Sequence, residues 1–432
     1  IRAYIETLTQ NLARDPACDG HELQKFIEKD SHEFPDWINH SRESSLKKYK
    51  EVCPKHLKNA TWKNTKLNEM LNDFFEKEFS VQQSTLENID LKSNLNNSLT
   101  IYFHSGVFFT EEEIPSYIKL LNHKYLEENQ SIFGLEDRPE RQSIPYLLNN
   151  IVSRDALMID TAVNQHVERL IHVVYLPNQN ANVAPRLNIN VSKNSSIKII
   201  EEHLQSKNSI INHCIDINCE ATSTLEYYKV NHRQNDSYLI SNLNLNQEED
   251  TDVKIFNLDL GADSGSSLNH LKLNGENSNV ACSTLFMPSD HRSSHQNVVI
   301  DHLSDKSSSS VNFRGVINDQ ATGSFFGKVR VAKERRGTSA FMQNKNLLLS
   351  DESKISTVPI LEIYNDDTEC SHSATSGSLD KEKLFYLKTR GINENDAKDF
   401  LIKSFIDELA SQIKSRRMRD YVNEIIAGNY KV

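Results

Sequence analysis

Four short groups of histidine, cysteine and aspartate are the residues of this chain best suited to chemistry. Imidazole nitrogen and thiolate sulfur are common protein ligands of soft metal ions and metal clusters. The groups are His213-Cys214 with Cys219, His291 with His295 beside Asp290, Asp301-His302, and Cys370 with His372. Each group holds fewer than four donors, so none completes a metal site by sequence alone.

Cys370 and His372 form the most suggestive pair, because they alternate at the end of a segment with strand character. Residues i and i+2 of a strand point to one face, about 6 to 7 Å apart. Both could therefore serve one site, completed by an open position or by a second chain. On residue type alone, the sequence favours a buried small side chain for Cys370 and a structural role for His372.

The group of His213, Cys214 and Cys219 favours a structural role. Adjacent strand residues point to opposite faces, so His213 and Cys214 cannot serve one site on one strand. His291 and His295 lie four residues apart and are flanked by Asp290, and Asp301-His302 follows a segment with strand character.

Nucleotide and hydrolase motifs are missing from the sequence. The segments 261–265 and 314–327 contain glycine, but neither matches a phosphate-binding loop or precedes a helix. No GxSxG nucleophile motif occurs, and the serine runs at 293–294 and 307–310 are typical of loops. We expect a protein that is not an enzyme.

Composition limits the classes of partner. The net charge is −11, and the strongest basic cluster is a short helix end at residues 414–419, so nucleic acid is not an expected partner. No stretch is apolar enough for a membrane helix, and no signal peptide is expected at the start. Six scattered cysteines without a CxxC pair favour a reducing compartment, and we expect a cytoplasmic protein.

Three regions must position these residues. Helical periodicity predicts an N-terminal helical region, 1–98. A β core over 99–377 follows, with a mixed first segment, 99–160, in which residues 117–121 and 144–148 both have a helix-like pattern. Residues 378–432 return to helical periodicity and form the third region.

The β core consists of many short strands separated by asparagine, serine, aspartate and glycine. This pattern fits a sandwich or barrel and a stacked parallel β-helix about equally well. The chain has 44 asparagines but only 13 glycines. Asparagine tolerates left-handed turns and can form amide ladders along a stack.

The C-terminal region contains an apolar stripe. Leu401, Phe405 and Leu409 recur at i+4 spacing on one helix face, and Arg390-Gly391 marks the end of the preceding helix. The stripe could pack on the rest of this chain, which is the more common arrangement, or could dock a partner.

Several motifs in the second half of the chain go beyond generic patterns. They are 312–316 (Asn-Phe-Arg-Gly-Val), 323–329 (Gly-Ser-Phe-Phe-Gly-Lys-Val), 344–350 (Asn-Lys-Asn-Leu-Leu-Leu-Ser), 359–367 (Pro-Ile-Leu-Glu-Ile-Tyr-Asn-Asp-Asp), 370–375 (Cys-Ser-His-Ser-Ala-Thr) and 384–392 (Leu-Phe-Tyr-Leu-Lys-Thr-Arg-Gly-Ile). In this order they resemble the SufB/SufD family of iron–sulfur cluster assembly proteins, as does the Trp62–Leu67 element. The 370–375 motif is similar to the SufD branch, although Ser373 replaces its usual glycine.

This resemblance implies a mainly β fold, a right-handed parallel β-helix flanked by N-terminal and C-terminal α-helical regions. It implies a non-catalytic scaffold that pairs with SufB through the β-helix and binds the SufC ATPase through its C-terminal helices. Within that scaffold, His372 and then Cys370 are the candidate iron or cluster ligands at the SufB interface. The candidate SufC contacts are Phe385, Tyr386, Leu387, Arg390, Leu401, Phe405 and Leu409.

The resemblance also fixes the expected cofactors. No cofactor should bind stably to this chain alone, a nascent cluster or iron could lie at the SufB interface, and ATP and Mg²⁺ belong to SufC. A flavin on the assembly stays open. Two alternatives remain: a β-helix carbohydrate-active enzyme, and a homodimeric metal-delivery protein that works without SufB.

Overall fold

The structure is a computed structural model that describes residues 20–56, 70, 95, 97–104, 106–121, 143–176 and 180–429. Its first elements are helix α3 (His21–Asp30), the short 3₁₀ helix η1 (Ser31–Glu33) and helix α4 (Asp36–His56). The Trp62–Leu67 element and most of the predicted helical segment around residues 67–75 lie outside the described residues.

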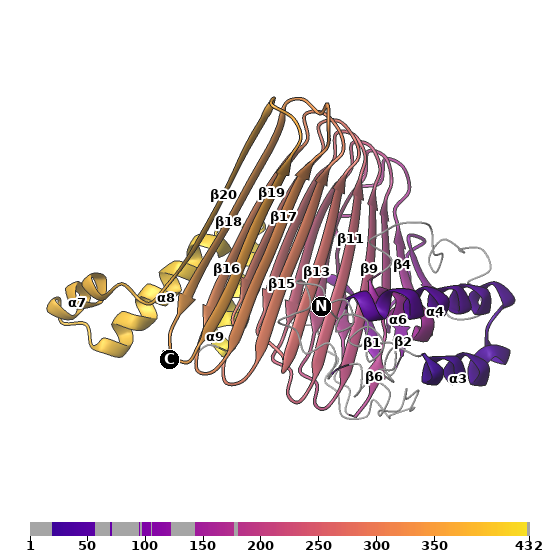
Figure 1. Cartoon of the computed structure of the whole chain (residues 1–432), viewed down its shortest axis with the longest axis horizontal. Helices are drawn as coiled ribbons and strands as arrows, with labels where there is room; N and C mark the ends of the chain where they lie inside the picture. The colour runs from indigo at the N-terminus through magenta and orange to yellow at the C-terminus, as the bar shows by residue number, and fades with distance from the viewer. Residues whose placement is uncertain are drawn as a thin grey trace, which may run out of the picture.

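Two long sheets face each other across a shared core, and their strands are stacked along the long axis of the molecule (Figure 1). The first has the order β2-β1-β5-β8-β10-β12-β14-β16-β18-β20, and the second β19-β17-β15-β13-β11-β9-β7-β4-β3, with β6 beside β9. The strands are β1 (Ser98–His104), β2 (Val107–Phe109), β3 (Ile118–Leu121), β4 (Ala156–Asp160), β5 (Leu170–Tyr175), β6 (Asn182–Val183), β7 (Arg186–Val191), β8 (Ser196–His203), β9 (Ile210–Cys219), β10 (Thr224–Asn231), β11 (Tyr238–Gln247), β12 (Asp252–Asp259), β13 (Ser264–Leu273), β14 (Asn279–Phe286), β15 (Ser293–His302), β16 (Ser308–Ile317), β17 (Thr322–Val331), β18 (Thr338–Leu348), β19 (Lys354–Ile363) and β20 (Thr368–Gly377).

From β7 onward the chain alternates between the two sheets, and each strand pairs in parallel with the strand two elements later. This topology is a parallel β-helix, so the prediction drawn from the family resemblance is confirmed and the sandwich or barrel alternative is wrong. One turn adds 28 residues where Asn218 stacks on Asn190, with its amide nitrogen 2.9 Å from the oxygen below. Asn246 stacks on Asn218 in the same way, at 3.2 Å.

Asparagine and aspartate also close the turns of the coil. Thirteen described non-glycine residues have positive φ, and ten of them are asparagine or aspartate. Asn194 and Asn208 are two examples, and their amides reach Asn164 and Asn180 one turn below. The asparagine excess therefore serves both the left-handed turns and the amide ladders.

The interior of the β-helix, here called the lumen, is filled by side chains that alternate along each strand. Most are aliphatic or aromatic and fully buried, as at Ile199, Ile217, Val280 and Phe313. Burial of this apolar surface, at about 25 cal/mol per Å², is the main force that holds the stacked turns together.

The two segments with a helix-like sequence pattern have different structures. Residues 144–148 begin helix α6 (Ile144–Val152), as expected, with Ser143 as its cap. The helix-like pattern at 117–121 is misleading, because Ile118–Leu121 is strand β3, paired antiparallel with β4. Pairing with a neighbouring strand outweighs the weak helical preference of so short a segment.

Helices cover the outer faces of the two sheets. Helices α3, α4 and α6 share an apolar cluster with Ile210 and Ile240 of the second sheet. Helices α8 (Glu394–Ala410) and α9 (Arg416–Asn429) cover the first sheet, where Ile406 and Val422 join Phe256 and its neighbours. Helix α7 (Lys381–Thr389) has no buried residue and projects beyond β20 in Figure 1.

The two ends of the β-helix differ. At the N-terminal end each sheet finishes in an antiparallel strand, β2 or β3. At the C-terminal end the sheets finish in the long parallel strands β19 and β20. In the part of the chain that the structure describes, no helix is long and apolar enough to cross a membrane.

Candidate functional site

Cys370 and His372 lie on β20, the last strand of the first sheet. In the register with β18, Cys370 lies beside Ala340 and His372 beside Met342. Ala340 and Met342 are buried members of the lumen core, so both ligand candidates are on the lumen side of the final turn. The prediction that both residues face the same side of one strand is therefore confirmed. Because β20 is the last strand of its sheet, the pair lies at the C-terminal end of the β-helix, here called the open end.

The two side chains differ in exposure. Cys370 is half-buried and packs against the lumen core, while His372 is exposed. Burial raises the pKa of the Cys370 thiol, and the charge of Glu369 adds to this, although a backbone hydrogen bond with Ala340 opposes it. The pair offers a thiol that stays protonated near neutral pH and an imidazole that is open to solvent.

No third ligand lies beside the pair in the part of the chain that the structure describes. Among the described residues, the one group of three or more potential ligands at metal-binding spacing is Glu201, His203 and His213, on earlier strands. Cys370 and His372 are therefore half of a site, and any completion at the open end must come from outside the described residues.

The open end carries exposed apolar side chains. Val358 and Ile363 on β19 and Tyr364 just after it are between 39% and 56% exposed. Such residues are unusual beside an uncovered strand edge, because the edge already presents unpaired backbone groups. Pro359 lies on the same strand, and it has no N–H to offer a pairing strand.

Helix α7 carries the first of the predicted partner contacts. Phe385 is 69% and Tyr386 56% exposed, while Leu387 is half-buried. Arg390 caps the helix C-terminus and places its guanidinium 5.2 Å from the Tyr386 ring centre. Gly391 follows with φ of 88°, as expected for the residue after a helix end.

Helix α8 carries the rest of the predicted contacts, and they differ in exposure. Leu401 and Phe405 are half-buried, and Leu409 is fully buried against the first sheet. The guanidinium of Arg314, on β16, lies 5.0 Å from the Phe405 ring and pairs with Glu408. Leu409 and Phe405 thus hold α8 on the β-helix, and Phe400, 60% exposed, is the large apolar side chain that α8 presents to solvent.

The other histidine and cysteine groups of the sequence do not converge. His213 and Cys219 point into the lumen, whereas Cys214 lies on the opposite face with its Sγ 3.7 Å from the Asn242 amide. His302 is buried with both ring nitrogens 2.8 Å from serine hydroxyls. The predicted splitting of His213 from Cys214 is confirmed.

Glu201 and His203 are not among the candidate ligands predicted from the sequence, although the alternation of residues along their strand indicates that they are buried. On β8 the lumen-facing residues are Ile197 and Ile199, and the same alternation continues to Glu201 and His203. A carboxylate and an imidazole in phase with buried isoleucines indicate polar side chains inside the core.

Comparisons with known proteins give a consistent result. The family described as "SUF system FeS cluster assembly, SufBD core domain" matches residues 174–405. The iron–sulfur cluster assembly protein SufD of Escherichia coli is 34% identical over 161 residues, which is 37% of this chain and 38% of that protein. A SufBD family protein of Mycobacterium leprae is 25% identical over 252 residues, 56% of this chain and 64% of that protein.

A chloroplastic protein of Arabidopsis thaliana, ABCI7, is 31% identical over 134 residues, 31% of this chain and 28% of that protein. The matched segments thus span less than two thirds of each of these relatives.

Proposed function

This chain belongs to the SufB/SufD family of iron–sulfur cluster assembly proteins and is SufD-like, and we propose that it is a non-catalytic scaffold subunit of a SufB–SufC–SufD complex. The observation that carries the proposal is the half-site of Cys370 and His372 at the uncovered end of the β-helix. Its cargo is iron or a nascent cluster, which a second chain helps to hold.

The partner at the open end is a SufB-type chain with its own β-helix. Strands β19 and β20 each present one edge that no described strand covers, and the apolar rim of Val358, Ile363 and Tyr364 lies beside them. A second β-helix end would pair with these edges and cover the rim. It would also bring ligands to the side of the lumen on which Cys370 and His372 lie.

The partner at the C-terminal helices is the SufC ATPase. Phe385 and Tyr386 on α7 and Phe400 on α8 are exposed aromatic side chains, and these three residues are here called the aromatic dock. Helix α7 contacts α8 but has no buried residue, so a partner surface would give it the apolar burial that it lacks. ATP and Mg²⁺ belong to SufC.

A physical connection joins the aromatic dock to the half-site. Arg314 on β16 donates to the Phe405 carbonyl and pairs with Glu408, so it ties α8 to the first sheet. Strand β16 pairs with β18, which pairs with β20. Movement of α7 and α8 during ATP hydrolysis by SufC would therefore pull on the sheet that carries Cys370 and His372, and open the interface to iron and sulfide.

The cellular compartment stays a prediction. Cys214, Cys219, Cys282 and Cys370 are free thiols, which suits a reducing compartment. Cys53 is in a disulfide bond, which is more typical of an oxidising one. One relative is a chloroplastic protein. A flavin on the assembly is a further possibility, for which the described residues favour no particular contact.

The ligand role of His372 is tested in the complex. We expect His372→Ala, co-expressed with SufB and SufC and purified anaerobically, to leave the complex intact and to lower its iron and sulfide content several-fold. Ser371→Ala is the matched control, because Ser371 lies on the same strand beside the exposed Phe341 and points to the opposite face. Normal iron content in the His372 variant would contradict the ligand role.

A further inference from the structure

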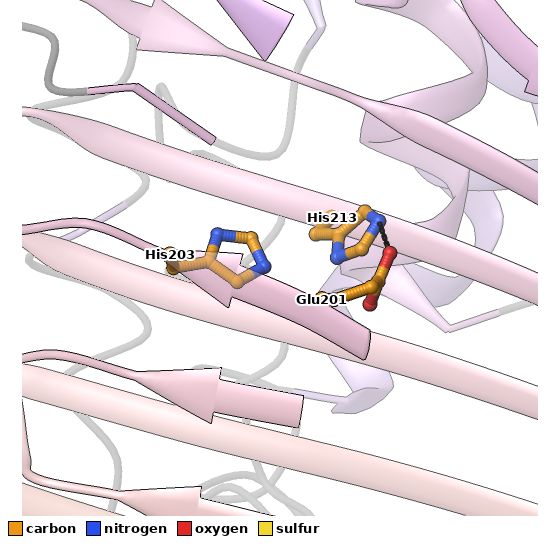
Figure 2. A group of neighbouring side chains, drawn as sticks. All are labelled: Glu201, His203 and His213. Atoms are coloured by element: carbon orange, nitrogen blue, oxygen red, sulfur yellow. Dashed lines mark ion pairs between the residues drawn. The ribbon is translucent and has the colours of Figure 1, made fainter. Parts of the chain in front are cut away.

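The lumen contains a polar cluster well away from the open end. Glu201 and His203 come from β8 and His213 from β9, so they belong to both sheets of one turn. All three are 0% exposed. Figure 2 shows the three side chains pointing toward one another across the lumen, with His213 Nε2 3.5 Å from Glu201 Oε1.

We propose that Glu201, His203 and His213 form a buried site for one divalent first-row transition metal ion, such as Zn²⁺ or Fe²⁺. Their donor atoms all lie within 4.8 Å of one another. An ion with bonds of about 2.1 Å can hold donors up to about 4 Å apart. Small side-chain rotations would therefore bring all three donor atoms within bonding distance of one ion. Two imidazoles and one carboxylate form a common donor set for both metals.

Unsatisfied nitrogens point to a ligand at this place. Both ring nitrogens of His203 and Nδ1 of His213 are buried without a hydrogen-bond partner among the described residues. A buried polar atom without a partner costs about 1 to 3 kcal/mol, and such atoms are rare in native proteins. A metal ion would satisfy one nitrogen of each ring at once.

The surrounding residues already orient the three candidates. The Tyr175 hydroxyl donates to Glu201 at 2.8 Å and lies 3.0 Å from Nε2 of His213, while Tyr227 donates to the other oxygen of Glu201. The ring of Tyr175 stacks on His203 with centres 4.1 Å apart. Such outer contacts fix the orientation of metal ligands, and they leave Nδ1 of His213 for the ion.

Charge and protonation are compatible with a cation. Burial, aided by the nearby charge of Lys229, holds the pKa of both histidines well below the ordinary value, so their nitrogens are free of the second proton. Lys229 is the opposing cation, and it interacts with the carboxylates of Glu201 and Asp259. Burial raises the pKa of Glu201 and of Asp259, and the charge of Lys229 together with the hydrogen bonds to each carboxylate opposes this rise.

This site is distinct from the half-site on β20 and does not depend on it. A buried ion would be acquired as the chain folds, so its binding energy would stabilise the β-helix. It would be a resident ion of the lumen, whereas Cys370 and His372 handle cargo.

The test uses the full chain with the open end disabled by Cys370→Ser and His372→Ala. The protein is produced in medium with Zn²⁺ or Co²⁺, dialysed and analysed for metal. We expect about one ion per chain in this background, and at least a tenfold loss with His203→Gln. His302→Gln is the matched control, since His302 is equally buried but has both nitrogens bonded to serines, and it should keep its metal.

Two results would overturn the proposal: no retained metal in the parent chain, as expected if water occupies the space, or full retention in the His203 variant. If His203→Gln fails to fold, the visible spectrum of the Co²⁺ form of the parent chain shows which type of ligand holds the ion. Nitrogen and oxygen ligands give d–d bands without a thiolate charge-transfer band. A thiolate band would assign the ion to a cysteine and would also reject the site.

Discussion

Glu202 joins the first sheet to the C-terminal helix through a single carboxylate. It accepts hydrogen bonds from Tyr421 of α9 at 2.7 Å and contacts His172 and His232 at 2.9 and 2.7 Å. Burial alone would raise its pKa, but the hydrogen bonds from the two histidines outweigh burial and hold the pKa well below the usual value. The ionised carboxylate therefore contributes to the stability of the fold.

We predict that Glu202→Gln lowers the free energy of unfolding by about 2 to 4 kcal/mol at pH 7, because it removes a buried, paired charge. Since the folded pKa is depressed, the stabilisation is complete above the unfolded value of 4.5 and is lost as the pH falls below it. Urea unfolding at pH 7, 5 and 3.5 measures this. The difference between wild type and variant should shrink at the lowest pH.

The exposed Glu424 on the same C-terminal helix provides the control, and Glu424→Gln should change stability by less than about 0.5 kcal/mol. An equal loss in the two variants would mean that general charge, rather than the Glu202 network, is responsible.

At the residue scale, the sequence correctly predicted which face of a strand a residue occupies, because this depends only on the alternation of side chains along the strand. It placed Cys370 and His372 on one face and separated His213 from Cys214. It did not predict Glu201 beside His213, because that contact joins β8 to β9 across the lumen and depends on how the two sheets stack. No spacing along one strand encodes a distance between sheets.

At the scale of the strand, the amide ladder of Asn190, Asn218 and Asn246 connects three successive turns of the β-helix. Asn218 donates to Asn190 and accepts from Asn246, so it is the central member. We predict that Asn218→Ala lowers the free energy of unfolding by about 1 to 2 kcal/mol, the value of two neutral hydrogen bonds in a half-buried position. Chemical denaturation at neutral pH measures the loss.

A double-mutant cycle with Asn190→Ala separates the ladder from local effects, since the two changes should be less than additive. Asn274→Ala, at an exposed turn, should be near neutral. Additive losses at 190 and 218 would show that the amides do not act as a ladder.

At the scale of elements, alternation predicted that the core is built of strands, but it did not choose between a sandwich and a β-helix. Both folds bury alternate residues, and they differ in whether a strand pairs with its neighbour in sequence or with the strand one turn away. The segment Ile118–Leu121 failed for a related reason, since its pairing with β4 is non-local. Helix α6 was predictable because its apolar run and its Ser143 cap are local.

At the scale of the whole molecule, the protein has one covered end and one uncovered end. The antiparallel strands β2 and β3 finish the N-terminal end, and at the other end no described strand covers β19 and β20 beside Val358 and Tyr364. The aromatic dock lies on α7 and α8, which follow β20 in the chain, whereas the apolar rim lies on β19 and just after it. The chain therefore offers two separate surfaces, and the proposed complex assigns a different partner to each.

We predict that these two surfaces can be disabled independently. Val358→Lys with Tyr364→Lys should weaken SufB binding at least tenfold, because two ammonium groups would be desolvated against an apolar rim. Binding of SufC should be unchanged. Phe385→Ser with Phe400→Ser should have the reverse effect, and both double variants should unfold like wild type, since all four side chains are between 44% and 69% exposed.

Affinity measurements with each partner separately, together with the native mass of the chain alone, distinguish the arrangements. If the rim instead joins two copies of this chain, the lysine variant would convert a dimer to a monomer, and SufB would not compete for that surface. If the rim variant lost both partners while keeping its fold, a single shared surface would replace the two proposed here. Two separate surfaces require that the rim variant loses SufB alone and that the dock variant loses SufC alone.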